Sequence, residues 1–271
     1  MGQVFACFRR VPPRPDPPAE IAGSPNPDPL PLDPRRRTLL SSKFIIAIDF
    51  GTTYTGVAWA NFKGSTNLED GSSSTRTLTE QIWVYKNWPA VSNAYTEKTP
   101  SLISYLTNPP TWGGRVRRQQ KPQVSRFKLG LDPEKARHVF GIESGEGMIG
   151  LDPELGKNAL DVTADFLTQL IEHIETIALP IALGQGFLAV QSKLYVMTVP
   201  AIWSDRAKDL TRQAAARAGI PRDQLILVPE PEAAALYCAT AGHELDLANG
   251  DTFIICDAGG GTVVCKPLRL G

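Results

Sequence analysis

The segment from residue 194 to residue 256 alternates between short apolar runs and helical patterns, joined by connections of only a few residues. Three runs in it read as strands: residues 194–199, 225–228 and 252–256. Between them, Ser204 is a favourable residue for starting one helix, and Pro231 stands at the first helical position of a second. This order of strands and helices predicts an α/β domain built on a mostly parallel sheet. Such sheets bind ligands at the ends of their strands.

An earlier apolar run, residues 44–48, opens the folded part of the chain and is typical of a strand covered on both faces. Gly51 and the threonines after it predict a tight turn into a second strand at residues 57–60, and therefore a hairpin. Apolar residues then recur at helical spacing from residue 160 to residue 178. They predict an amphipathic helix with His173 at its surface or boundary.

Two stretches differ from this core. Residues 1–42 are predicted to be a disordered tail, because ten prolines between residues 11 and 34 favour polyproline II over packed structure. Docking of this tail on a proline-reading domain is the alternative. The first seven residues resemble a lipidation signal, but Ala6 stands where serine or threonine is expected. Residues 64–150 are richer in Gly, Pro, Ser and Trp and are predicted to form a peripheral subdomain.

The composition excludes several classes of protein. Lys plus Arg and Asp plus Glu both number 28, so no net charge points to nucleic acid or an anionic membrane. The four cysteines form no C-x-x-C pair, which predicts a reducing, cytoplasmic location and no structural metal. We find no apolar stretch of the roughly 20 residues that a membrane span needs. We therefore expect a protein without a membrane span.

Two segments carry the same pattern of an apolar strand, an aspartate, a spacer, glycine and then threonine: residues 46–53 and 254–262. Glycine lets backbone amides approach an anion closely, and threonine hydroxyls add further donors for phosphate. An aspartate beside a phosphate makes sense only with a cation between them, and hydrated magnesium meets that need. Either loop alone could be an ordinary turn, but the pair predicts a site for a magnesium nucleotide.

Four segments, in this order, resemble the heat shock protein 70 family: residues 49–56, 199–219, 230–235 and 257–262. They are similar to its first phosphate loop, its Val-Pro-Ala strand and helix, its Glu-Pro-Thr-Ala-Ala-Ala helix and its second phosphate loop. Residues 112–113 and 127–129 are more similar to the divergent member 12 branch. The resemblance implies that residues 43–271 form the N-terminal lobe of an actin-like ATPase domain, a ribonuclease H-like fold.

Carried over residue by residue, the resemblance implies a site for ATP and Mg²⁺. Asp49 and Asp257 would hold magnesium through water, and Glu230 would orient the water network, unless Glu230 merely begins a helix. The residues that would line the phosphates are Gly51, Thr52, Thr53, Tyr54, Gly259, Gly260, Gly261 and Thr262. Hydrolysis would be in-line attack by water, for which the protein supplies position and charge.

The sequence departs from the family pattern at two positions and at its end. Arg117 stands at the position of the catalytic lysine, and arginine cannot replace a compact ammonium without a shift in position. Val264 replaces an aspartate of the second loop, and the pattern stops after it, so that a second lobe is missing. A truncated or misread gene product and a natural one-lobed protein both stay open.

The function predicted is that of an ATP-binding, heat-shock-70-like protein whose parent architecture is a magnesium-dependent ATPase, with impaired activity in this form. A catalytically inactive binding or regulatory module is the alternative. A sugar kinase of the same superfamily is less favoured, because residues 230–235 resemble the helix of the heat shock protein 70 family. We expect nucleotide as a ligand and client or regulatory proteins as partners. With one wall of the cleft, magnesium-ATP should bind more weakly than about 100 micromolar.

Overall fold

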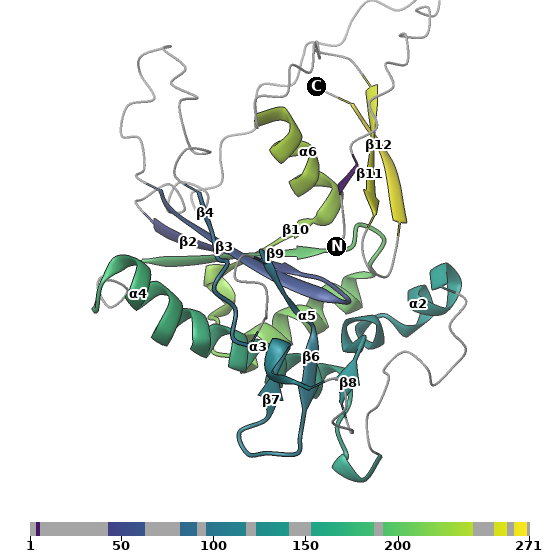
Figure 1. The fold of residues 1–271 in the computed structure, drawn as a ribbon. Coiled ribbons are helices and arrows are strands. Elements are labelled where there is room, and N and C mark those ends of the chain that lie inside the picture. The colour runs from purple at the N-terminus through teal and green to yellow at the C-terminus, as the bar shows by residue number, and fades with distance from the viewer. Residues whose placement is uncertain are drawn as a thin grey trace, which may run out of the picture.

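The structure is a computed structural model of the chain. It describes residues 4–5, 43–62, 82–90, 96–117, 123–140, 153–186, 192–240, 252–258 and 263–269. At the centre lies a mixed sheet of six strands with helices on both faces (Figure 1). Helices α3, α4 and α5 lie on one side of this sheet and α6 on the other. The predicted α/β class is confirmed.

The central sheet has the strand order β10-β9-β2-β3-β4, with β5 also paired to β3. Its strands are β2 (Lys43–Phe50), β3 (Tyr54–Phe62), β4 (Trp83–Val84), β5 (Lys98–Pro100), β9 (Lys193–Val199) and β10 (Leu225–Pro229). Strands β10, β9 and β2 are mutually parallel, whereas β3 runs antiparallel to β2, β4 and β5. The β2–β3 pair is the predicted hairpin.

The helices begin and end where short-range signals place them. They are α2 (Pro133–Phe140), α3 (Ala159–His173), α4 (Leu179–Leu183), α5 (Asp205–Arg217) and α6 (Glu230–Thr240). The Ser204 side chain caps α5 as predicted, by accepting a hydrogen bond from the Ala207 amide at 3.2 Å. Helix α3 continues through a π-helical turn, Ile174–Ala178, into α4. The wider turn precedes Pro180, which has no amide hydrogen to donate to the regular ladder.

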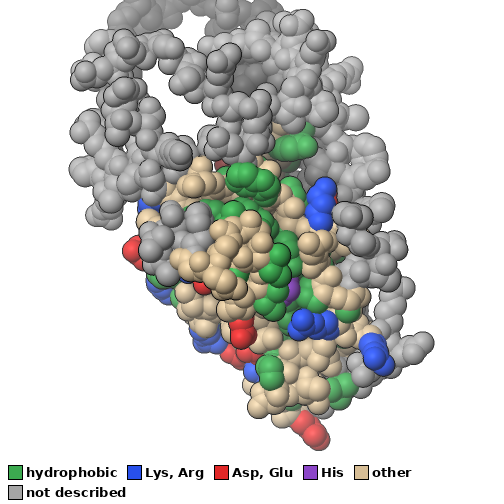
Figure 2. All heavy atoms as spheres, turned by 60° about the vertical axis from the view of Figure 1, so that its left-hand side comes forward, with side chains coloured by type: hydrophobic (Ala, Val, Ile, Leu, Met, Phe, Trp, Pro, Cys, Tyr) green, Lys and Arg blue, Asp and Glu red, His purple; other side chains and the backbone are tan. Residues whose placement is uncertain are grey.

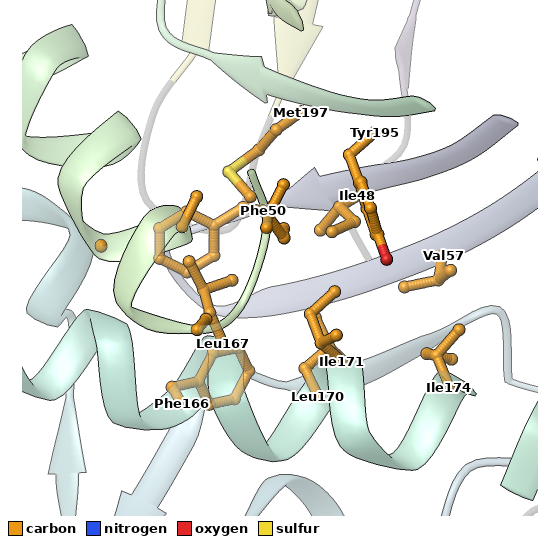
Figure 3. Packing of buried hydrophobic residues seen from close by; sticks show 14 of the residues in the cluster. Ile48, Phe50, Val57, Phe166, Leu167, Leu170, Ile171, Ile174, Tyr195 and Met197 are labelled. Carbon is orange, nitrogen blue, oxygen red and sulfur yellow. The ribbon is translucent and has the colours of Figure 1, made fainter. Parts of the chain in front are cut away.

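Helix α3 packs against the central sheet and forms one side of the core (Figure 3). The buried helix residues in this contact are Phe166, Leu167, Leu170, Ile171 and Ile174. They meet residues from three strands: Ile48, Phe50, Val57, Tyr195 and Met197. Burying an aliphatic or aromatic side chain of this kind stabilises the fold by about 1.5–3 kcal/mol. The predicted amphipathic helix is confirmed and supplies the platform under the carboxyl ends of the strands.

His173 does not lie at the surface, so that prediction is wrong. Only 7% of it is exposed, and its Nε2 atom lies 2.9 Å from the hydroxyl of Tyr85. The rings of Trp88 and Trp112 also lie against it. These aromatic residues come from segments that the spacing within the helix cannot reveal, and they cover the carboxyl end of α3.

The segment predicted as a peripheral subdomain is shared between two sheets. Strands β4 and β5 belong to the central sheet, so a boundary at residue 64 does not separate the units. A second sheet, of order β7-β6-β8, contains β6 (Leu102–Ser104), β7 (Thr111–Trp112) and β8 (Val124–Ser125). Short 3₁₀ turns occur at Gly113–Arg115, Phe127–Leu131, Pro153–Leu155 and Arg222–Gln224.

A third sheet contains β1 (Val4–Phe5), β11 (Thr252–Ala258) and β12 (Val263–Arg269). Strand β11 was expected to close the central sheet, but it pairs antiparallel with β12 and β1 instead. Figure 1 shows this sheet beside α6, on the same side of the central sheet as that helix. Strand β1 falls within the predicted tail; the rest of residues 1–42 lies outside the described residues, so their disorder stays a prediction.

The continuous helical segment Ala159–Leu183 is long and apolar enough to span a membrane by length and composition, whereas the sequence predicted no apolar stretch of that length. Its apolar side packs on the sheet, so the segment serves as a core helix and gives no evidence of a span.

Figure 2 shows hydrophobic side chains gathered in one band of the face it views. The large exposed hydrophobic residues of the protein include Ile82, Trp83 and Val84 at strand β4.

Candidate functional site

Charged and polar side chains gather at the carboxyl edge of the parallel strands. Asp49 lies near the end of β2, Thr198 near the end of β9, and Glu230 directly after β10. The register pairs Ile48 with Met197, so Asp49 and Thr198 are brought together at this edge. In α/β sheets, ligands bind outside the carboxyl ends of the strands.

A tight turn follows β2, and it requires glycine at Gly51. A Cβ atom there would lie 2.2 Å from the carbonyl oxygen of Tyr54, closer than any real contact. Ser101 holds the turn from the side: its amide donates to the Thr53 carbonyl and its hydroxyl to the Gly51 carbonyl, both at 2.8 Å. Both hydrogen bonds from Ser101 go to carbonyl oxygens of the turn, so Ser101 accepts none from the backbone amides of the turn.

Both carboxylate oxygens of Asp49 have partners. The Thr198 hydroxyl donates to Oδ1 at 2.8 Å, and the Lys98 ammonium lies 2.6 Å from Oδ2. Burial by itself raises the pKa of Asp49, but the charge of Lys98, the hydrogen bonds from Lys98 and Thr198 and the charge of Lys128 together lower it. The carboxylate is therefore held in its ionised form.

Lys128 is the buried cation of this edge, with 3% of its side chain exposed. Its Nζ atom lies 2.6 Å from Glu230 Oε1 and 2.5 Å from the carbonyl oxygen of Phe50. It also lies over the rings of Phe50 and Trp203, at 5.5 and 5.4 Å from their centroids. A lysine is seldom buried so deeply, and here a carboxylate, a carbonyl and two aromatic faces compensate the charge.

The structure brings together six of the residues predicted for the site: Asp49, Gly51, Thr52, Thr53, Tyr54 and Glu230. Glu230 satisfies both readings of it, since it is the first residue of α6 and also carries an ion pair. Arg117 is exposed beyond the turn Gly113–Arg115, and the cation found beside Glu230 is Lys128 instead.

The second loop is described only in part. The backbone of Asp257 lies in β11 and pairs with Val264 of β12, the residue that replaces the family aspartate. The Asp257 side chain and the loop residues Gly259, Gly260, Gly261 and Thr262 lie outside the described residues. The structure therefore describes the first of the two predicted loops, and the phosphate-binding role of both loops stays a prediction.

Sequence reasoning missed four residues of this site: Lys98, Ser101, Lys128 and Thr198. Lys128 was noticed only as part of a motif, although a lysine between Phe127 and Leu129 is itself a signal, because a charge within an apolar run needs a partner. No signal in the neighbouring sequence distinguishes Lys98, Ser101 or Thr198. Their contacts depend on strand register.

The arrangement around Asp49 does not fit the expected magnesium ion. The Lys98 ammonium and the Thr198 hydroxyl engage both of its carboxylate oxygens. A hydrated cation could reach Asp49 only after Lys98 moved away.

The central mixed sheet, its flanking helices and the glycine turn after its first strand define one lobe of an actin-like ATPase. A scan against models of protein families finds no match. Single relatives do match: 70 kDa heat shock protein 12A from Mus musculus is 31% identical over 218 residues, covering 72% of this chain and 28% of its own length. The Homo sapiens 12A protein is 30% identical over 216 residues, with the same coverage.

A plant relative covers more of the chain. The stromal 70 kDa heat shock-related protein of chloroplasts from Pisum sativum is 26% identical over 247 residues, which is 85% of this chain and 29% of the relative. The chain belongs to the heat shock protein 70 family, and its similarity to the 12A proteins agrees with the predicted branch. The chain spans less than a third of the length of these relatives.

Proposed function

We propose that the chain binds ATP, with the phosphates held at the turn of residues 51–54. The observation that carries this proposal is the convergence of that turn, Asp49 and the Lys128–Glu230 pair at one edge of the sheet. Amides of a glycine turn and threonine hydroxyls are donors suited to phosphate oxygens. Membership of the heat shock protein 70 family supports ATP as the nucleotide.

We further propose that Lys128 takes the role first assigned to Arg117. Its ammonium lies at the carboxyl edge and is held by Glu230 and by the carbonyl of Phe50. In phosphoryl transfer, fixed positive charge and positioned water account for most of the catalysis. In the complete architecture, Lys128 would place the charge and Glu230 would orient water.

A specific observation favours a second candidate, a catalytically inactive binding or regulatory module. Lys98 forms an ion pair with Asp49, the carboxylate that the predicted hydrolysis mechanism assigns to magnesium. Val264, which replaces an aspartate of the family pattern, pairs with Asp257 in the third sheet. In this reading, the partners are client or regulatory proteins. Relatives named as chaperone proteins are consistent with such partners, and a cytoplasmic location stays a prediction.

Equilibrium dialysis of labelled ATP against the 271-residue chain tests the proposal. We expect saturable one-to-one binding with a dissociation constant above about 100 micromolar. Gly51→Ala should weaken it by about tenfold or more, because the added Cβ displaces the turn. Gly156→Ala is the matched control: it has a positive φ of 58°, but its Cβ would meet nothing within 4 Å. Equal binding by both variants would sink the assignment, and phosphate release would separate hydrolase from binding module.

A further inference from the structure

Three residues form a row across three neighbouring strands at the edge of the site. Asp49 on β2 pairs with Gly56 on β3, and Gly56 in turn pairs with Lys98 on β5. The Lys98 ammonium reaches past the middle strand to Asp49 Oδ2, at 2.6 Å. The contact is therefore set by the register of the sheet and not by chance proximity of two surface side chains.

Gly56 makes this reach feasible. A Cβ atom at that position would lie 3.2 Å from Lys98 Cγ, 3.7 Å from Lys98 Cε and 3.2 Å from the Glu97 carbonyl oxygen. The stem of Lys98 thus lies directly over the glycine, and a side chain at position 56 would crowd it. The sequence therefore places Asp49, Gly56 and Lys98 at paired positions on three neighbouring strands.

The ion pair is accessible from the solvent side of the site. The side chains of Lys98 and Asp49 are 44% and 43% exposed, so a ligand at the adjoining turn can approach the ammonium. Thr198 donates to the other oxygen of Asp49, so both carboxylate oxygens already have a partner. An ammonium here cancels the charge of Asp49 that would otherwise repel phosphate.

We propose that Lys98 is a built-in counter-cation of the nucleotide site, which stands beside Asp49 in place of hydrated magnesium and makes nucleotide binding nearly independent of that ion. This inference rests on the proposed nucleotide binding and specifies its cation requirement. A tethered ammonium carries one charge and donates directly to phosphate oxygens, and it needs no recruitment from solution. Without the Lys98 ammonium, the same site would need a metal ion to offset the charge of Asp49 before phosphate could bind.

The test is the dissociation constant of ATP, measured by equilibrium dialysis up to millimolar concentrations, in excess magnesium and in excess EDTA. For the 271-residue chain, we expect the two constants to agree within about threefold. Lys98→Gln keeps a polar side chain and exposes the charge of Asp49. For this variant, we expect binding in EDTA to weaken by about tenfold or more, while binding in magnesium changes little.

Two further variants control the comparison. Lys86→Gln removes the same charge from a neighbouring lysine of similar exposure, 45%, which pairs with Glu97 and not with Asp49. It should leave both constants unchanged. Lys98→Arg should restore binding in EDTA at least in part. Because the Lys98–Asp49 pair is half exposed, the fold should survive all three substitutions, and circular dichroism checks this.

The outcomes separate this inference from the proposed function. An equally strong magnesium requirement in the parent chain and in Lys98→Gln would overturn the counter-cation role and leave nucleotide binding in place. A loss of binding in EDTA that Lys86→Gln reproduces would also overturn it, because general surface charge would then be responsible. If no variant binds ATP in excess magnesium, the proposed function itself fails.

Discussion

Lys128 Nζ and Glu230 Oε1 lie 2.6 Å apart, although the two residues are separated by 102 positions in the chain. The contact joins the turn Phe127–Leu131 to the first residue of α6. Both partners are largely removed from solvent, with 3% and 18% of their side chains exposed. The pair thereby links a peripheral segment to the carboxyl edge of the central sheet.

Removing the ammonium should destabilise the fold measurably. In Lys128→Met, the Glu230 carboxylate and the Phe50 carbonyl lose their partner in a poorly hydrated environment. We expect the free energy of unfolding to fall by about 2–4 kcal/mol in urea titrations. Arg117→Met is the matched control, since this exposed residue should contribute less than about 0.5 kcal/mol. Equal effects of the two substitutions would contradict the role given to Lys128.

Ser101 should matter for the same turn in a different way. Its hydroxyl donates to the Gly51 carbonyl and lies 2.9 Å from the hydroxyl of the fully buried Thr55. Ser101→Ala leaves the Thr55 hydroxyl without that partner and should cost about 1–2 kcal/mol of unfolding free energy. Thr107→Val, which removes an exposed hydroxyl, should cost less than about 0.5 kcal/mol. An undiminished urea midpoint for Ser101→Ala would show that the turn needs no such support.

Asp49 should affect chemistry far more than stability. The Asp49–Lys98 pair is nearly half exposed, so Asp49→Asn should change the free energy of unfolding by less than about 1 kcal/mol. In a longer chain with a complete nucleotide domain, the same substitution should lower ATP hydrolysis by about tenfold or more, because it removes the carboxylate charge that faces the cation of the site. Phosphate release measures this. Unchanged turnover would remove Asp49 from the site.

His173 predicts a pH dependence of stability. Burial, followed by the positive charge of Arg115, lowers the pKa of this imidazole in the folded protein below its usual 6.5. The unfolded chain therefore takes up a proton as pH falls below about 6.5, while the folded chain does not. Its contribution to stability is complete above that pH and is lost as pH falls toward the lower folded-state pKa.

The comparison with His173→Gln isolates this contribution. Stability measured by urea unfolding between pH 7.5 and about 5 should fall more steeply for the parent chain than for the variant. Parallel curves would show that the histidine already titrates normally in the folded state. The amide of glutamine can keep a hydrogen bond to Tyr85, so the variant should remain folded at neutral pH.

The sequence was sufficient wherever the deciding interactions were local. The cap at Ser204, the helical spacing that leads into π-helical Ile174–Ala178 and the turn at Gly51 each depend on neighbours within a few residues. They were predicted correctly because caps, periodicity and glycine conformations act at short range. The hairpin β2–β3 followed from the same turn.

The sequence was insufficient where distant segments meet. Thr198 reaches Asp49 across 149 positions, and Lys98 reaches it across 49, so only strand register reveals either contact. His173 was misplaced because aromatic residues from another segment cover it. Strand β11 was expected in the central sheet because its pattern is that of a buried strand, and the pattern does not say which strands it pairs with.

The Trp203 ring beneath the Lys128 ammonium has a practical consequence. A cation 5.4 Å from an indole perturbs its excited state, so the emission of Trp203 depends on where that ammonium stands. Trp88 and Trp112 lie instead in the cluster around His173. A ligand that draws Lys128 toward itself should therefore alter the fluorescence of this tryptophan in particular. Trp203 should therefore report binding at the proposed site through its own emission, with Trp203→Phe as the control.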